Sequence, residues 1–355
     1  MFMTKHIQNH HDFEKYSREK KVGKEMLSSF FESKFTTKSP TQYLNKINWE
    51  NPNDPLKLMT IPHTLEKKIK EYEVTDPIGD RPHLATDNLV HRYPDKVLLL
   101  LTNNCQINCR FCFRRELSHH SAPPNIEKII EYIIDHSETK EVIFSGGDPL
   151  TLSPKYINNV CQRLNKINHI TKIRFHTRIP IVNPDHIDEK YLELFEQIAK
   201  QKQLTIVLHV NHLNELDDKN IELFKKLRKS ALLMSQTVLL KGVNDNKKTL
   251  SDLFSYLVNH NVKPYYLHHL DLVKGTSHFR ISIKKGKEIY ESLHRILPKN
   301  KIPKYVLDLP GGKGKVPVIE MKILKNGSYQ AKNFKGEIIS YIDPANSPTS
   351  PQNQK

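Results

Sequence analysis

The chain has 355 residues, and its 55 Lys and Arg against 39 Asp and Glu give a formal net charge of +16 at pH 7. Its longest aliphatic run, Val97 to Leu101, is far shorter than the ~20 residues that span a bilayer, which argues against a transmembrane protein. The polar amino terminus has no apolar signal segment, so we expect a cytoplasmic protein.

The elements follow a regular order after a polar start. The first ninety residues are rich in lysine and proline and predict short helices and loops. From residue 96 on, short β-branched or aromatic runs predict six strands, which begin near Val97, Glu141, Lys172, Leu204, Leu232 and Pro264. Apolar residues at three- and four-residue spacing predict six helices, which begin near Ile126, Tyr156, Tyr191, Asn220, Thr249 and Gly286.

Strict alternation of strands and helices predicts an α/β fold with a parallel sheet, either a partial barrel or an open doubly wound sheet. In both architectures, function belongs at the carboxyl ends of the strands. We expect four parts: an extension over residues 1–90, a barrel core over 91–300, a carboxyl-terminal segment over 301–342 and a disordered tail over 343–355.

Three of the four cysteines, Cys105, Cys109 and Cys112, form a CxxxCxxC loop directly after the first of the six strands. Three thiolates can ligate three irons of a [4Fe–4S] cluster, and the open fourth iron suits the amine and carboxylate of S-adenosylmethionine. The alternative is a zinc site completed by His119 or His120. Cys161 lies in a helical pattern and is expected to be a small buried hydrophobe.

This motif and its neighbours resemble the lysine 2,3-aminomutase family of the radical S-adenosylmethionine superfamily. The segments that carry the resemblance lie between about residues 76 and 318 and read HRYPDKVLLLLTNNCQINCRFCFRRE, SGGDPL, HTRIPIV, TVLLKGVND, PYYLHHLD and LPGGKGKVPV. The resemblance implies a partial (β/α)6 TIM-like barrel with a mainly helical amino-terminal extension and a short carboxyl-terminal segment. It also implies three cofactors, namely a [4Fe–4S] cluster, S-adenosylmethionine and pyridoxal 5′-phosphate.

The cofactor residues that the resemblance implies occur in several segments. Gly146, Gly147 and Asp148 follow the second of the six strands, where two glycines let the backbone approach the amino group of S-adenosylmethionine. Lys315 is expected to form the Schiff base with pyridoxal phosphate. Spacing alone does not decide between Lys315 and Lys313, and the family pattern favours Lys315.

The resemblance assigns Arg92, Tyr93 and Gln236 to cofactor binding as well. Arg92 is expected to hold the phosphate by charge-assisted hydrogen bonds, although it could also be a capping or surface arginine. Lys96 stands where the lysine enzymes more often have arginine, so the phosphate contact there is expected to be less bidentate.

Substrate choice is implied by three further residues. Arg114 matches the position that binds the substrate carboxylate, and Asp271 and Asp308 match the pair that binds the ε-ammonium group. Two neighbouring carboxylates favour a cationic side chain between them, so the pattern indicates L-lysine rather than L-glutamate. The implied reaction moves nitrogen from Cα to Cβ after hydrogen abstraction by a 5′-deoxyadenosyl radical, and its product is β-lysine.

Other assignments remain open at this stage. The compact length is similar to that of the branch that makes β-lysine for elongation factor P, but that branch often has glutamate where Asp308 stands. The lack of cysteine after Cys161 argues against a structural zinc and against a radical RNA methyltransferase. The scattered lysine pairs favour a solvated surface over nucleic-acid binding. A one-electron reductant protein is the expected partner, and a homodimer is one oligomeric state to test.

Overall fold

The computed structural model describes residues 6–7, 9–20, 37–116 and 124–346. Its central feature is a ten-stranded sheet in which the strands follow their order in the chain. The strands are β3 (Leu84–Thr86), β4 (Leu89–Tyr93), β5 (Lys96–Thr102), β6 (Glu141–Gly146), β7 (Lys172–Thr177), β8 (Gln203–His209), β9 (Leu232–Leu239), β10 (Lys263–His269), β11 (Lys304–Leu309) and β12 (Gly314–Pro317).

Strands β5 to β11 pair in parallel, and antiparallel β4 and β12 extend the two ends of this run. The six strands predicted from sequence are confirmed as β5 to β10. Strand β11 adds a seventh parallel strand that the sequence did not predict. Strands β3 and β4 likewise replace the end of what was expected to be helices and loops over residues 1–90.

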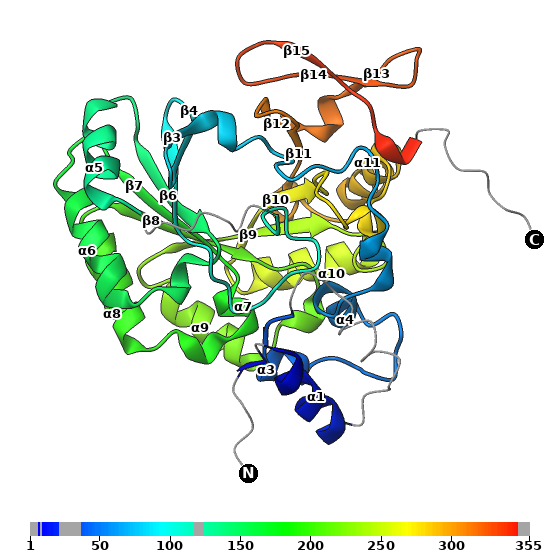
Figure 1. The fold of residues 1–355 in the computed structure, drawn as a ribbon, viewed down its shortest axis with the longest axis horizontal. Coiled ribbons are helices and arrows are strands. Elements are labelled where there is room, and N and C mark those ends of the chain that lie inside the picture. The colour runs from blue at the N-terminus through cyan, green and yellow to red at the C-terminus, as the bar shows by residue number, and fades with distance from the viewer. Residues whose placement is uncertain (1–5, 8, 21–36, 117–123, 347–355) are drawn as a thin grey trace, which may run out of the picture.

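Six helices connect the parallel strands and confirm the predicted α/β alternation of a partial (β/α)6 barrel. They are α5 (Ile126–Asp135), α6 (Pro154–Asn165), α8 (Glu189–Ala199), α9 (Asp218–Leu227), α10 (Lys247–Asn259) and α11 (Ile283–His294). Polar N-cap side chains begin each of them; Ser153, for example, accepts the backbone N–H of Tyr156. Figure 1 shows α5, α6, α8 and α9 following one another along the outside of the sheet.

The main core lies between the outer face of the sheet and these helices. Alternate strand residues such as Phe144 and Phe175 are fully buried there, and their rings stack at 4.6 Å. Cys161 of α6 is buried in the same cluster, as predicted. A buried aromatic side chain of this size stabilises the fold by about 1.5–3 kcal/mol.

The amino-terminal elements form a second, smaller core. They are β1 (His6–Ile7), α1 (His10–Glu19), β2 (Ser39–Pro40), α3 (Thr41–Leu44) and α4 (Pro55–Thr60). Phe13, Tyr43 and Leu56 are buried there against Val182 of the short helix α7 (Ile179–Val182) and against Leu270. The extension is therefore packed against residues that follow β7 and β10.

The carboxyl-terminal segment forms an antiparallel sheet at the top of Figure 1. Its strands are β13 (Lys322–Ile323), β14 (Tyr329–Lys332) and β15 (Ile338–Tyr341). The predicted tail starts at Asp343, but this residue is buried, and its carboxylate accepts the backbone N–H of Ile283 at 2.6 Å. Residues 347–355 lie outside the described residues. No helix in the described ranges is long and apolar enough to cross a membrane.

Candidate active site

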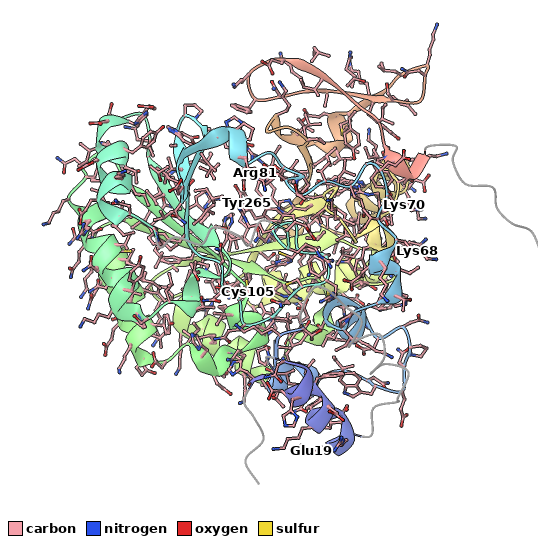
Figure 2. The ribbon with its side chains drawn as sticks, viewed as in Figure 1. Glu19, Lys68, Lys70, Arg81, Cys105 and Tyr265 are labelled. Atoms are coloured by element: carbon pink, nitrogen blue, oxygen red, sulfur yellow. The ribbon has the colours of Figure 1, made fainter. Side chains whose placement is uncertain are left out.

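A cavity of about 430 Å³ lies at the carboxyl ends of the parallel strands. Figure 2 labels two residues of its lining, Cys105 on the loop after β5 and Tyr265 on β10. Every site residue predicted from sequence borders this cavity: Arg92, Tyr93, Cys105, Cys109, Cys112, Arg114, Gly146, Gly147, Asp148, Gln236, Asp271, Asp308 and Lys315. The topology thus brings together residues that are more than two hundred positions apart.

The backbone at the start of the cysteine loop packs closely against two glycines at the end of β6, Gly146 and Gly147. Gly146 has φ +107°, and a Cβ atom there would lie 2.5 Å from the carbonyl oxygen of Thr102. A Cβ on Gly147 would lie 2.3 Å from the carbonyl oxygen of Asn104. These glycines are therefore required by backbone packing against the start of the cysteine loop, in addition to any contact with a ligand.

Asp148 organises the same corner of the site. Its carboxylate accepts the Thr177 hydroxyl at 2.7 Å and the backbone N–H groups of Leu150, Arg178 and Ile179. The side chain is buried and its oxygens already have protein donors. Its contribution in this structure is to fix the turn after Gly147 and the beginning of α7.

The three thiols line the cavity as free cysteines. Burial and the neighbouring Asp148 raise the pKa of Cys105, and burial together with Cys109 raises the pKa of Cys112 to about 11. Among the described side chains, no three His, Cys, Asp or Glu residues already form a closed metal cage. Three soft thiol donors on one loop fit an iron–sulfur cluster with one open iron.

Lys315 is held in place by Asp308 and Tyr93. Its Nζ lies 2.8 Å from Oδ2 of Asp308, and its backbone N–H donates to the Tyr93 hydroxyl at 2.9 Å. Burial lowers the pKa of Lys315, but the charge of Asp308, its hydrogen bond with Lys315 and the Tyr93 hydroxyl together outweigh burial, so the net shift of the pKa is upward. By contrast, the side chain of Lys313 is exposed, and Lys313 does not border the cavity.

Asp271 and Asp308 face the cavity from the ends of β10 and β11, and their pKa values are shifted in opposite directions. Burial raises the pKa of Asp308, but the charges of Lys315 and Arg92 and the hydrogen bond from Lys315 lower it by more, so the net shift is downward. Burial and the charge of Asp308 raise the pKa of Asp271 to about 7. A cation bound between the two carboxylates would therefore lower the pKa of Asp271 and favour its ionised form.

Two arginines lie near these carboxylates. Arg92 on β4 pairs with Asp80 at 2.7 Å, donates to the carbonyl of Ile78, and has one nitrogen 3.7 Å from Asp308. Arg114, after the cysteine loop, pairs with the other oxygen of Asp80 at 2.7 Å. The side chains of Arg92 and Arg114 are only 6% and 12% exposed, which does not support the alternative of a surface arginine at position 92. Lys96 borders the same space but pairs with Asp95 at 2.9 Å.

Sequence reasoning missed several lining residues. His176, His209 and His268 occupy comparable positions near the ends of β7, β8 and β10, and this repeated placement could have indicated them. Burial lowers the pKa of all three, to about 4 for His268, so they are neutral at pH 7. They can accept or donate a hydrogen bond without adding positive charge.

Arg178 is another residue that the sequence did not single out for the site. Its Nη1 donates to the sulfur of Cys109 at 2.6 Å, and its Nη2 pairs with Glu215 at 2.7 Å. Gln236 lies on β9 beside the cavity, and its backbone carbonyl accepts the N–H of Val210. His119 and His120, the histidines of the zinc alternative, lie outside the described residues.

Comparison with known proteins agrees with this geometry. The model of the radical SAM superfamily matches residues 99–253. A putative L-lysine 2,3-aminomutase of Aquifex aeolicus is 38% identical over 307 residues, which cover 84% of this chain and 82% of that protein. The L-lysine 2,3-aminomutase of Methanococcus maripaludis is 36% identical, with 82% and 68% covered, and that of Escherichia coli K12 is 35% identical, with 80% and 83% covered.

Proposed function

Because the chain belongs to the lysine 2,3-aminomutase family of the radical SAM superfamily, and is therefore an isomerase, we propose that its cavity converts L-lysine to β-lysine. The observation that carries this proposal is the convergence of three kinds of group on one cavity. These are the three thiols, the amine of Lys315, and the carboxylates of Asp271 and Asp308 together with Arg114.

The residues present fit the three cofactors of the family. Cys105, Cys109 and Cys112 would ligate the cluster, the backbone at Gly146 and Gly147 would contact S-adenosylmethionine, and Lys315 would hold pyridoxal phosphate. When bound, the cluster and S-adenosylmethionine supply the radical, and pyridoxal phosphate supplies the π-system that lets nitrogen move between adjacent carbons. The rest of the catalytic work is binding and orientation.

Phosphate binding falls to Arg92. Its guanidinium is buried, already oriented by Asp80 and Ile78, and close enough to Asp308 to sit beside Lys315. A fixed guanidinium fork favours a phosphate group, because two N–H donors match two oxygens. Tyr93 then keeps the backbone of Lys315 at a constant distance from this phosphate site.

Substrate recognition follows from the charges at opposite ends of lysine. Arg114 would bind the carboxylate, and Asp271 with Asp308 would bind the ε-ammonium group. Asp308 pairs with the ammonium of Lys315 in this structure, so it becomes available once the Lys315 amine holds the cofactor. L-glutamate would place a carboxylate against this pair, which is why we expect it to be rejected.

The neutral histidines make the cavity polar without making it more cationic. His268 lies 3.9 Å from Asp308, and its low pKa keeps it uncharged when a cationic substrate arrives. His176 and His209 also stay neutral because burial lowers their pKa values. Oriented neutral donors and acceptors in a confined site hold a substrate without the reorganisation that water would require.

Finer assignments are part of the same proposal. We place the reaction in the cytoplasm, with a one-electron reductant protein as electron source. Delivery of β-lysine to elongation factor P and release of free β-lysine use the same chemistry at this cavity, and the lining residues favour neither fate. A homodimer is compatible with the proposal and is not required by it.

The test uses anaerobic protein reconstituted with iron, sulfide and pyridoxal phosphate, supplied with S-adenosylmethionine and dithionite. We expect β-lysine from L-lysine and no product from L-glutamate, measured by mass-resolved chromatography. Lys315→Ala should abolish turnover and bound pyridoxal absorption, whereas Lys313→Ala, its exposed neighbour, should keep both. Cluster and pyridoxal binding without any lysine turnover would refute the assignment of the substrate.

A further inference from the structure

The segment between α4 and β4 is bound to neighbouring parts of the chain by three buried carboxylates spaced seven residues apart, Glu66, Glu73 and Asp80. Figure 2 shows this segment passing Lys68 and Lys70 before it reaches Arg81 beside β4. Glu66 pairs with Arg110 and Arg115, and Glu73 accepts the backbone N–H groups of residues 275–277. Both contacts join the segment to loops, after β5 and after β10.

The third carboxylate, Asp80, makes a different kind of contact. Its Oδ1 accepts a hydrogen bond from Arg92 at 2.7 Å, and its Oδ2 forms an ion pair with Arg114 at 2.7 Å that lacks hydrogen-bond geometry. One buried carboxylate thus pairs with two guanidinium groups. Arg92 comes from β4, and Arg114 comes from the end of the cysteine loop. Without a shared anion, two cations this close would repel each other and move apart.

Arg92 and Arg114 each have one N–H donor that Asp80 does not use. Within the described residues, the buried Nε atoms of Arg92 and Arg114 have no hydrogen-bond partner. A buried N–H without an acceptor costs about 1–3 kcal/mol. Both residues border the cavity, so each guanidinium has a donor left for an anion bound there.

The turn that carries Asp80 is itself fixed to the Lys315 loop. The carboxylate of Asp76 accepts the backbone N–H groups of Asp80 at 3.0 Å and of Arg81 at 3.0 Å. A Cβ on Gly79, where φ is +66°, would lie 2.1 Å from the backbone nitrogen of Gly312. His83 also contacts the carbonyl of Gly312 at 3.0 Å.

We propose that Asp80 is a positioning residue that sets the spacing between Arg92 and Arg114, and so couples the phosphate site of the cofactor to the carboxylate site of the amino acid. The inference rests on the proposed function, because that function assigns an anion to each arginine. It goes beyond that assignment by making both sites depend on one carboxylate, which borders the cavity and acts on each anion through an arginine. If Asp80 acted only through its negative charge, its removal would have the opposite effect, because Arg92 and Arg114 would then attract both anions more strongly.

The experiment measures binding without turnover, on reconstituted protein without S-adenosylmethionine or reductant. The affinity for pyridoxal phosphate is measured from its absorption. L-lysine and L-lysinamide, which lacks the carboxylate, are then titrated separately, and the change in this absorption gives the affinity for each. In Asp80→Asn we expect pyridoxal phosphate to bind at least about tenfold more weakly, and the preference for lysine over lysinamide to fall at least about tenfold. Asp80→Glu, which keeps the charge, should recover part of both.

Control measurements separate this role from a fold defect. Asp87→Asn changes an exposed aspartate in the next turn and should leave both affinities unchanged. Iron content of Asp80→Asn should match the parent protein, because Asp80 pairs with Arg92 and Arg114 rather than with a cysteine of the loop. Tighter binding of both anions, a loss confined to one of them, or unchanged affinities would overturn the proposal. If the parent protein bound pyridoxal phosphate but did not distinguish lysine from lysinamide, the substrate assignment would fail instead.

Discussion

Replacing Asp271 with asparagine should change stability and activity in opposite directions. Burial and the neighbouring Asp308 raise the pKa of the Asp271 carboxyl from 3.8 to about 7. In the unfolded chain this carboxyl ionises at its ordinary pKa. Between the two pKa values the unfolded chain is therefore favoured by ionisation and the folded protein is not, which lowers the stability of the fold. Asparagine keeps nearly the same shape and never ionises, which removes this loss of stability.

The size of the stability gain follows from the shift. A displacement of about 3 units corresponds to an upper limit of about 4 kcal/mol at 1.36 kcal/mol per unit. The side chain faces the cavity, where water screens its charge, so we expect a gain of about 1–2 kcal/mol at pH 8. The gain should be absent near pH 4, grow as the pH rises toward 7, and stay constant above it, because a raised acid pKa destabilises the fold only as the pH rises.

Activity should fall because the substrate ammonium loses one of its two carboxylates. Breaking one partner of a buried charge pair costs about 2–5 kcal/mol, which is about 30-fold to more than a thousandfold in kcat/KM for L-lysine. Thermal unfolding of the cofactor-free protein between pH 4 and 9, beside anaerobic turnover, measures both effects. The exposed Asp87→Asn is the matched control. A variant less stable than the parent at pH 8, or one with unchanged kcat/KM, would refute the reasoning.

Three further changes test the packing around the site. Gly147→Ala should push the cysteine loop away from Asn104, cost about 1–3 kcal/mol and lower iron content, whereas Gly327→Ala, with open space around it, should keep the iron. Cys112→Ala should lose iron in a metal assay, whereas Cys161→Ala should keep it and lose only stability, because Cys161 is buried in the main core. Glu66→Gln should lower the free energy of unfolding at pH 7 by about 3 kcal/mol, because Arg110 and Arg115 lose their shared anion. Burial opposes ionisation of Glu66, but Arg110 and Arg115 lower its pKa, so this difference should shrink in urea titrations as the pH falls below 4.5.

The six central strands and their helices could be predicted because each is encoded locally. Runs such as EVIFSG alternate with amphipathic segments that begin at polar caps such as Ser153. Strand β11 escaped prediction because its short run, from Lys304 to Leu309, has no helical segment directly after it to complete the alternation. Strands β13 to β15 are only two to four residues long, so their pairing is set by turns and by contacts with the rest of the chain.

The site residues that lie in local sequence motifs could be predicted, and the others could not. Cysteine spacing and the glycine-rich lysine loop are local signals, and their residues all border one cavity. Asp80 and Arg178 carry no such signal. Their importance comes from partners 12 and 34 positions away for Asp80, and 69 and 37 positions away for Arg178, which only the folded chain brings together. The three cavity histidines lie between these cases, since their repeated place near strand ends is visible once the strands are known.

Lys315 and the substrate ammonium compete for Asp308, and this competition predicts an order of binding. In this structure the Lys315 ammonium lies 2.8 Å from Asp308, and that carboxylate contributes to a raised pKa of Lys315 despite burial. L-lysine should therefore bind weakly until pyridoxal phosphate engages Lys315. Calorimetry of cofactor-free protein should show tighter lysine binding by Lys315→Met, by about tenfold or more, than by the parent or by Lys313→Met. Equal lysine affinity in all three proteins would mean that Asp308 does not exchange one cation for the other, and that cofactor and substrate bind in either order.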